Sequence, residues 1–389
     1  MILLGSTGSI GVNTLKIAKR FHIEVEMLGA GSNITLLNAQ ISEHNPKAIL
    51  IAKECDIPKI TSEFQGEIYI GKDGILKAIR DSNSPLVLNA LSGFLGLEPT
   101  LCAISCGKVV ALANKESLVA GGELIDISKI IPIDSEHFSL SYLLGFSNLS
   151  SSKNLLRPFK NLYITASGGA FRDMELQEIP HQNAANALKH PNWQMGKKIT
   201  IDSATMVNKL FEILEAYWLF GSKNIDALIE KNSHIHALVE FWDGSVVAHF
   251  ANANMQLPIA YALCLGLGLP ESFLHQFTNA HQTTPNPIIE PLNFQTSNYH
   301  LQNIETARYP LWNLKNILLE NPKLGLALNA ANEIAVNAFL QDSIPFGAIH
   351  KIVQDSMQTF NKIHFNTLEE ILALDEEIRN YARGKLALH

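Results

Sequence analysis

The chain opens with Met1-Ile-Leu-Leu-Gly5-Ser-Thr-Gly8-Ser-Ile-Gly11, in which an apolar strand runs into a turn with three glycines. A helical pattern follows at once through Thr14, Ile17 and Ala18. Glycines between a strand and a helix let the backbone bend sharply, approach a pyrophosphate and offer it the N–H groups of the helix start. The opening therefore predicts a Rossmann-like unit that binds a dinucleotide. The alternative is a tight turn without a ligand.

Strand and helix patterns go on alternating through the first third of the chain. The apolar runs that predict buried strands are 48–52, 67–70, 85–89 and 109–112. This order is typical of a doubly wound parallel sheet, in which ligands sit beyond the carboxyl ends of the strands. Polar clusters at 89–93 and 113–117 follow two of these ends. Lys115 and Glu116 are either a solvated helix start or contacts to ribose or substrate.

The strand expected at 25–28 ends in Gly29-Ala-Gly31-Ser-Asn33. An enzyme that uses NAD usually has an acidic residue here, which binds the ribose hydroxyls. No acidic residue stands in this segment, so nothing would repel a 2′-phosphate, and NADPH is favoured over NADH. No arginine stands here either, so Ser32 and Asn33 could only hydrogen-bond that phosphate.

A second informative stretch, Ile131-Pro-Ile-Asp134-Ser-Glu136-His137, places two carboxylates directly after an apolar run. In extended backbone, Asp134 and Glu136 would project the same way and aim at one point. Carboxylate oxygens with room for water suit Mg²⁺ or Mn²⁺ better than zinc. Glu212, on a helix expected further along, could complete a three-carboxylate site. The alternative is a strand followed by a polar turn.

Two further segments have residue types that bind phosphate. Ser167-Gly-Gly169 follows an apolar strand and forms a candidate anion-binding turn. Further on, Asp202 or Ser203 is expected to cap a helix that carries Asn208 and Lys209. A helix start with a serine, an amide and an ammonium group suits a phosphate. In the alternative, these residues are ordinary charges on a helix surface.

A candidate lid lies between these two segments, in Lys189-His190-Pro-Asn-Trp193-Gln-Met195-Gly196. Pro191 and Gly196 break regular structure, and a Trp among polar residues is unusual for a core. The segment predicts a loop over 186–197 that closes over bound ligand. The alternative is a surface loop whose Trp covers the core.

Length and composition limit the class of protein. A chain of 389 residues is expected to form two or three domains. With 47% hydrophobic and 17% charged residues it has the composition of a soluble globular enzyme. A formal charge of −7 without a long basic run argues against nucleic-acid binding. Four cysteines without disulfide-like spacing predict a cytoplasmic location, and no apolar run is long enough to predict a membrane span.

Changes of pattern along the chain predict the domain boundaries. Residues 1–133 are expected to form the dinucleotide-binding domain. Residues 134–264 would form a central α+β catalytic domain, 265–300 a linker and 301–389 a small helical bundle. Within the catalytic domain, Asp243-Gly244 between two apolar runs predicts a β-hairpin.

Taken together, the motifs closely resemble the 1-deoxy-D-xylulose 5-phosphate reductoisomerase family. They occur in the family's order at 5–11, 113–119, 134–137, 167–169, 190–193, 202–212 and 328–334. The resemblance implies conversion of 1-deoxy-D-xylulose 5-phosphate and NADPH to 2-C-methyl-D-erythritol 4-phosphate, an early step of non-mevalonate isoprenoid biosynthesis. It also implies Mg²⁺ or Mn²⁺, with Co²⁺ as an alternative, and a homodimer that acts on a phosphorylated sugar and not on nucleic acid or membrane.

The resemblance assigns roles to residues of this chain, motif by motif. Metal ligands are Asp134, Glu136 and Glu212. Catalytic residues are Lys115, Asp134, Glu136, Glu212 and His236. Substrate contacts are Lys115, Ser135, Glu136, Ser167, His190, Trp193, Ser203, Asn208, Lys209 and Glu212, with Met195 in the lid and Met255 nearby. Cofactor contacts are Thr7, Gly8, Ser9, Ile10, Gly31, Ser32, Asn33, Asn114, Glu116 and Gly196.

One departure from the family's pattern and two competing functions remain. Family members often carry a basic residue where Ser32 stands, which leaves the strength of NADP over NAD selection open. A simple NADP-linked dehydrogenase for a phosphorylated sugar or semialdehyde would share the glycine loop without needing the metal site. A dinucleotide-sensing protein would bind the cofactor without turnover.

Overall fold

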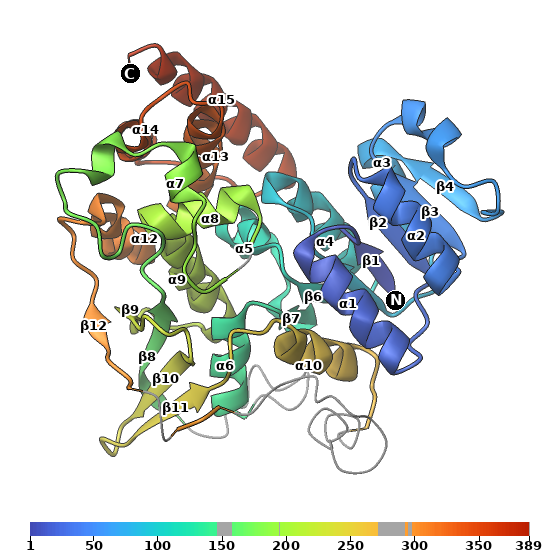
Figure 1. The fold of residues 1–389 in the computed structure, drawn as a ribbon, viewed down its shortest axis with the longest axis horizontal. Helices are drawn as coiled ribbons and strands as arrows, with labels where there is room; N and C mark the ends of the chain where they lie inside the picture. Colours follow the sequence, from blue (N-terminus) through green and yellow to red (C-terminus); the bar gives the residue numbers. More distant parts are fainter. Residues whose placement is uncertain (146–157, 194, 271–291, 295–297, 389) are drawn as a thin grey trace.

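The computed structural model describes residues 1–145, 158–193, 195–270, 292–294 and 298–388. They form two sheets covered by helices, with a group of helices near the C-terminus (Figure 1). The predicted fold class is confirmed: the chain is α/β, with an N-terminal Rossmann-like domain, a central α+β region and a helical C-terminal region. Most of the predicted linker, 265–300, lies outside the described residues.

The first sheet has seven parallel strands in the order β4-β3-β2-β1-β5-β6-β7. The strands are β1 (Ile2–Leu4), β2 (Met27–Ala30), β3 (Ala48–Ile51), β4 (Glu67–Ile70), β5 (Leu86–Asn89), β6 (Val109–Leu112) and β7 (Ile130–Pro132). All residues of β1, β2, β3 and β5 are buried, because helices cover both faces of the sheet. The strand order reverses between β1 and β5, which is where such sheets bind ligands.

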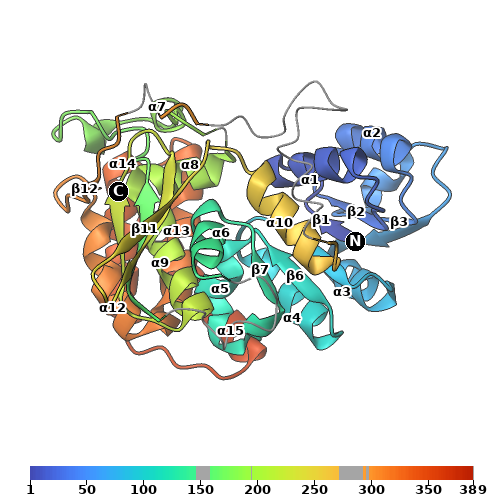
Figure 2. The same ribbon diagram turned by 90° about the horizontal axis from the view of Figure 1, so that it is seen from below.

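Helices lie on both faces of this sheet (Figure 2). One face carries α1 (Ser9–Arg20), α2 (Ile34–His44) and α10 (Gln256–Gly266), and the other carries α3 (Gly71–Asp81) and α4 (Leu97–Ser105). The strand predicted as buried at 67–70 is instead the edge strand β4, in which only Tyr69 is buried. An edge strand has a neighbour on one side only, so its apolar residues are less covered.

The position of α10 corrects one predicted boundary. Residues 134–264 are predicted to form one catalytic domain, yet Ile259 and Leu263 of α10 pack in the same apolar cluster as Leu3, Leu86 and Ile131 of the first sheet. The chain thus returns to the N-terminal domain after four of the five strands of the second sheet. Sequence reasoning misses this return because an apolar helix does not indicate which sheet it covers.

The second sheet has five strands in the order β11-β10-β8-β9-β12. They are β8 (Phe159–Ala166), β9 (Ile225–Ile229), β10 (Ile235–Phe241), β11 (Val246–Phe250) and β12 (Gln302–Asn303). The hairpin predicted at Asp243-Gly244 is confirmed, and Gly244 has the positive φ of +84° that this turn needs. The strand β12 pairs with β9, so the predicted helical range 301–389 begins with a strand of the catalytic sheet.

Helices join the second sheet to the C-terminal region. They are α5 (Lys115–Gly121), α6 (Ser135–Leu143), α7 (Ala184–Ala187), α8 (Lys197–Thr205), α9 (Val207–Phe220), α12 (Lys315–Glu320), α13 (Gly325–Leu340), α14 (Phe346–Thr359) and α15 (Leu368–Leu386). The helix α13 is buried nearly all round and packs against α14 and α15 on one side and α5 and α8 on the other. The C-terminal helices therefore share one core with the catalytic region. Within the described ranges, no helix is both long and apolar enough to cross a membrane.

Candidate active site

One pocket collects most of the predicted site residues. Those that line it are Ser9, Ile10, Lys115, Asp134, Ser135, Glu136, Ser167, His190, Trp193, Met195, Gly196, Ser203, Asn208, Lys209, Glu212, His236 and Met255. They come from the first turn of α1, from strand β10, from helices α5, α6, α8 and α9 with their N-caps, and from the loops that follow β8, α7 and β11. The remaining predicted residues, Thr7, Gly8, Gly31, Ser32, Asn33, Asn114 and Glu116, are not in its lining.

The two carboxylates of the Asp134 motif converge, but not through extended backbone. Asp134 is the N-cap of α6, and its Oδ1 accepts a hydrogen bond of 3.1 Å from the Glu136 N–H. The expected strand geometry is therefore wrong, and both carboxylates sit at one helix start instead. Glu212 reaches the same point from α9. Ligand oxygens of Asp134, Glu136 and Glu212 all lie within 4.8 Å of one another.

Two buried lysines neutralise these carboxylates. Lys115 Nζ lies 2.7 Å from Asp134 Oδ2 and 2.8 Å from Glu212 Oε1. Lys209 Nζ lies 3.0 Å from Glu136 Oε1 and also donates to Glu212. Three converging carboxylates that already hold cationic groups are a donor set of the kind that Mg²⁺ and Mn²⁺ prefer. The residues present therefore fit the divalent metal that the sequence predicts.

Burial and charge move the pKa values of these acids in opposite directions. Burial, reinforced by the charges of Glu212 and Asp134, raises the pKa of Glu136 to about 7 although Lys209 opposes the change. Burial also acts to raise the pKa of Asp134, but Lys115 and His137 outweigh it and hold that pKa well below its ordinary value. Asp134 thus stays ionised, whereas Glu136 holds its proton more readily in the metal-free protein.

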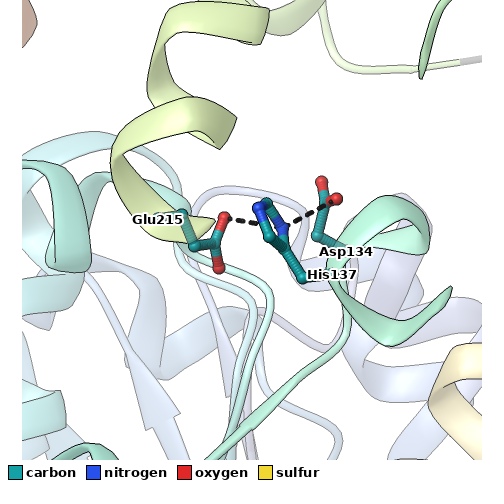
Figure 3. Close-up of side chains that lie close together, drawn as sticks. All are labelled: Asp134, His137 and Glu215. Carbon is teal, nitrogen blue, oxygen red and sulfur yellow. Dashed lines mark ion pairs between the residues drawn. The ribbon is translucent and has the colours of Figure 1, made fainter. Parts of the chain in front are cut away.

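His137 lies between Asp134 and Glu215 and is close enough to form an ion pair with each (Figure 3). His137 Nδ1 lies 3.0 Å from Asp134 Oδ1 and 3.3 Å from Glu215 Oε2, and Nε2 lies 2.8 Å from the Glu212 carbonyl oxygen. Burial alone would lower the pKa of His137, but the charges of Glu215 and Asp134 raise it to about 9. Nε2 donates to a carbonyl oxygen, and Nδ1 lies between two carboxylates, so His137 orients Asp134 as an ion-pair partner.

Sequence reasoning assigns no role to Glu215. A signal was present, because Glu215 follows Glu212 by three residues and so shares a face of α9.

The phosphate segment corrects a predicted helix start. Asp202 and Ser203 are expected to cap a helix, yet both lie in the last turn of α8. The chain breaks instead at Met206, whose φ of +68° ends α8 and begins α9. Gly169 packs so closely against α8 that an added Cβ would lie 2.7 Å from the Ser203 carbonyl oxygen. This contact brings the Ser167 turn beside Ser203 and beside Asn208 in the first turn of α9.

The predicted lid is tied to the phosphate turn by His190. The backbone N–H groups of Asn192 and Trp193 donate to His190 Nδ1 at 3.2 and 2.9 Å. The proton therefore sits on Nε2, which lies 2.9 Å from Ser167 Oγ. Burial, together with the nearby charge of Arg172, lowers the pKa of His190 to about 4, so the ring is neutral. Trp193 is half-buried and meets the buried His236 edge to face, with 6.3 Å between ring centroids.

The glycine loop has the geometry that a dinucleotide needs. Gly5 has φ of +87°, and an added Cβ would lie 2.4 Å from the Ala90 carbonyl oxygen. An added Cβ at Gly11 would lie 2.3 Å from the Gly5 carbonyl oxygen. The helix α1 begins at Ser9 with Gly8 at its N-cap, which leaves first-turn N–H groups for a phosphate. The loop therefore fits the predicted cofactor.

The segment expected to meet the 2′-phosphate is open to solvent. Gly31, Ser32 and Asn33 are exposed directly after β2. Asn33 is the N-cap of α2, where its Oδ1 accepts from the Leu36 N–H at 3.1 Å. The Ser32 hydroxyl and the Asn33 Nδ2 group are therefore the side-chain donors that this segment offers to a phosphate.

We expect Ser32→Arg to tighten NADPH binding more than NADH binding. The guanidinium could pair with the 2′-phosphate that only NADPH carries. Dissociation constants for both cofactors, measured by fluorescence titration, check this, with Ser62→Arg as a control at another exposed serine of the same domain. Equal changes for NADPH and NADH would show that residue 32 does not face the phosphate.

The fold and the site define a dinucleotide-dependent enzyme with a carboxylate metal site beside a phosphate pocket. Sequence comparison then identifies the family. The model of 1-deoxy-D-xylulose 5-phosphate reductoisomerase matches residues 1–122, that of the enzyme's C-terminal domain matches 130–220, and a DXP reductoisomerase C-terminal domain matches 250–381. The chain belongs to the 1-deoxy-D-xylulose 5-phosphate reductoisomerase family.

Relatives of that name match over nearly their whole length. The protein from Wolinella succinogenes is 51% identical over 383 residues, covering 98% of this chain and 99% of the relative. The protein from Helicobacter pylori strain 26695 is 49% identical over 383 residues, covering 97% and 98%.

Solved structures agree with this assignment. A DOX-P reductoisomerase in complex with NADPH, fosmidomycin and magnesium has a TM-score of 0.88 at 31% identity and covers 100% of this chain and 98% of its own. The Zymomonas mobilis enzyme in complex with NADPH has a TM-score of 0.82 at 31% identity and covers 99% and 98%.

Proposed function

We propose that this chain converts 1-deoxy-D-xylulose 5-phosphate to 2-C-methyl-D-erythritol 4-phosphate, using NADPH and Mg²⁺ or Mn²⁺. The observation that carries the proposal is that one pocket is lined by the carboxylate triad, by the residues predicted to bind phosphate, and by Ser9 and Ile10 at the end of the glycine loop. A simple dehydrogenase would need the glycine loop and the substrate pocket but not the triad.

Different residues of the pocket would have different roles in this reaction. Asp134, Glu136 and Glu212 would hold the divalent ion, which supplies Lewis-acid polarisation of the substrate's ketone and hydroxyl oxygens. Bound NADPH would supply the hydride for the final reduction. Lys115, whose pKa the neighbouring carboxylates raise well above its ordinary value despite burial, remains an ammonium group and a hydrogen-bond donor at this point.

A second set of residues binds the substrate away from its reacting carbons. Ser167, Ser203, Asn208 and Lys209 would bind the phosphate group, and such remote binding supplies energy for orientation. Lys209 would do so beside the carboxylates of Glu136 and Glu212, with which it is paired. The His190 ring donates to Ser167 and so fixes the turn. Trp193 and Met195 would cover the substrate and exclude water, which would otherwise divert reactive intermediates.

The direct test is NADPH oxidation monitored with 1-deoxy-D-xylulose 5-phosphate, with and without a chelator. We expect substrate-dependent oxidation that stops on chelation and returns with Mg²⁺ or Mn²⁺. Oxidation that survives complete metal removal would favour the simple dehydrogenase. Cofactor binding without turnover would favour the dinucleotide sensor.

We also propose that the chain works as a cytoplasmic homodimer. Support for the dimer comes from the edge strand β11 and its hairpin, where Val246, Phe250 and Trp242 are 54%, 36% and 68% exposed. Exposed apolar residues on an open strand edge favour pairing with another chain. Support for the location comes from the four cysteines, none of which forms a disulfide within the described residues.

Light scattering tests the assembly. We expect the mass of a dimer for the unaltered chain and a shift toward monomer for Val246→Lys, because the charge would be buried without a partner. Leu176→Lys, at an exposed leucine elsewhere, is the control. A monomeric mass for the unaltered chain at micromolar concentration would exclude the homodimer.

A further inference from the structure

A line of buried polar contacts runs from the C-terminal helix α13 toward the predicted cofactor residues. Asn332 of α13 is fully buried, and its Nδ2 donates to Asp202 Oδ1 at 2.7 Å. The other oxygen of Asp202 lies 2.8 Å from Lys198 Nζ, one turn earlier on α8. Lys198 Nζ also lies 2.9 Å from Glu116 Oε1. Asn332 therefore connects, through two ion pairs, to the first turn of α5.

The line continues from Glu116 into the loops that follow β5 and β6. Glu116 Oε2 lies 3.1 Å from Asn114 Nδ2, which also donates to the carbonyl oxygens of Leu91 and Gly93 at 2.8 Å each. These loops lie at the carboxyl ends of neighbouring strands, where a parallel sheet binds its ligand.

Glu333, the next residue of α13, contacts the loop after β5 directly. Glu333 Oε1 accepts from the Phe94 N–H at 3.0 Å, in the loop after β5. Its Oε2 lies 2.8 Å from Arg379 Nη2 of α15. Asn332 and Glu333 thus link the C-terminal helices to the loops at the carboxyl ends of β5 and β6.

The burial of these groups makes the contacts interdependent. The side chains of Asp202, Glu116 and Lys198 are 1%, 12% and 26% exposed. Burial acts to lower the pKa of Lys198, but the charges of Asp202 and Glu116 outweigh it and raise that pKa. Without Lys198, two carboxylates would face each other with little access to water, and Glu116 would be expected to move.

We propose that Lys198, Asp202 and Asn332 are positioning residues for NADPH, which fix Glu116 and Asn114 without touching the cofactor themselves. The C-terminal helices then increase cofactor affinity without contacting the cofactor. The ion pairs of Lys198 go to Glu116 and Asp202 rather than to the carboxylate triad, so metal binding should be independent of them. This inference rests on the proposed function, in which Glu116 and Asn114 contact NADPH.

The first test is Lys198→Met in the full chain. We expect the NADPH dissociation constant and its KM to rise about tenfold, the effect typical of losing a residue that orients a binding group. The kcat at saturating NADPH and the Mn²⁺ dissociation constant, measured by electron paramagnetic resonance, should stay near their original values. Lys198→Arg, which keeps the charge, should restore most of the NADPH affinity.

Lys315→Met is the matched control. Lys315 makes one ion pair, at 2.8 Å to Asp226, and lies 5.7 Å from the Trp312 ring centroid. Lys198 has a similar ring contact, at 4.6 Å to Phe211. We expect Lys315→Met to change stability without changing NADPH affinity, because its contacts lie away from α5.

Asn332→Ala gives a second, milder test that keeps all three charges. It should weaken NADPH in the same direction as Lys198→Met, and the two changes together should be less than additive because they act on one network. Asn332→Ala also tests the positioning role if Lys198→Met does not fold.

Unchanged NADPH affinity in folded Lys198→Met, or in Asn332→Ala, would overturn the inference. An equal loss of NADPH and Mn²⁺ affinity would also overturn it, since that is the behaviour of a merely structural residue. Glu116→Gln separates this failure from a failure of the proposed function. If Glu116→Gln leaves NADPH affinity unchanged, the positioning role fails, while substrate-dependent NADPH oxidation by the unaltered chain would still support the function.

Discussion

Glu212→Gln is expected to lower turnover by about a thousandfold while NADPH still binds. Polarisation by a well-held divalent ion supplies several kcal/mol to such reactions, and each 1.36 kcal/mol corresponds to about tenfold in rate. Glu212 is the most buried of the three carboxylates and accepts hydrogen bonds from Lys115, Asn208 and Lys209. Glutamine keeps the shape but removes the charge that the ion and both lysines need.

Glu230→Gln is the matched control for this change. Glu230 is equally buried but lies in the turn after β9, where its carboxylate accepts from the backbone N–H groups of Asn232 and His234 at 3.0 and 2.8 Å. The measurements are kcat with saturating Mg²⁺ or Mn²⁺, Mn²⁺ affinity and NADPH affinity. Normal turnover of Glu212→Gln at saturating metal would remove Glu212 from the triad.

The first sheet could be predicted because its signals are local. Each strand is a short apolar run, and the glycine loop joins the first of them to a helix within eleven residues of the start. The two departures there have non-local causes. The strand β4 is at an edge because of the strand order, and α10 returns to this sheet after four strands of the second sheet. Neither the edge position of β4 nor the packing partner of α10 can be inferred from the local sequence of these elements.

The site was predictable where residues share one short element. Asn208 and Glu212 are four apart, and the structure places them on one face of α9, where they are hydrogen-bonded to each other. The helix break at Met206 was not predictable, because a positive φ is rare for a residue without a short polar side chain. Lys198 and Asn332 were missed because their partners lie far away in the sequence and meet only in the folded chain.

Trp193→Ala is expected to lower turnover and the affinity for a hydroxamate–phosphonate substrate mimic about tenfold or more, with metal and NADPH binding nearly unchanged. The half-buried Trp193 ring lies at the pocket wall against His236, and its backbone N–H is held by His190, which in turn contacts Ser167. Removing the ring leaves these hydrogen bonds in place but uncovers the substrate. Small losses of cover and alignment have large effects on rate when the reaction depends on positioning.

Trp312→Ala shows how a core tryptophan behaves in the same chain. Trp312 is only 8% exposed, and truncating a buried Trp typically costs about 3–5 kcal/mol of stability. We expect Trp312→Ala to lower the melting temperature of the ligand-free protein strongly, and Trp193→Ala to lower it little. The lid role requires that affinity for the substrate mimic falls more in Trp193→Ala than in Trp312→Ala. If Trp193→Ala instead lowers the melting temperature as Trp312→Ala does and leaves affinity for the substrate mimic intact, Trp193 belongs to the core, and the loop 186–197 is not a lid.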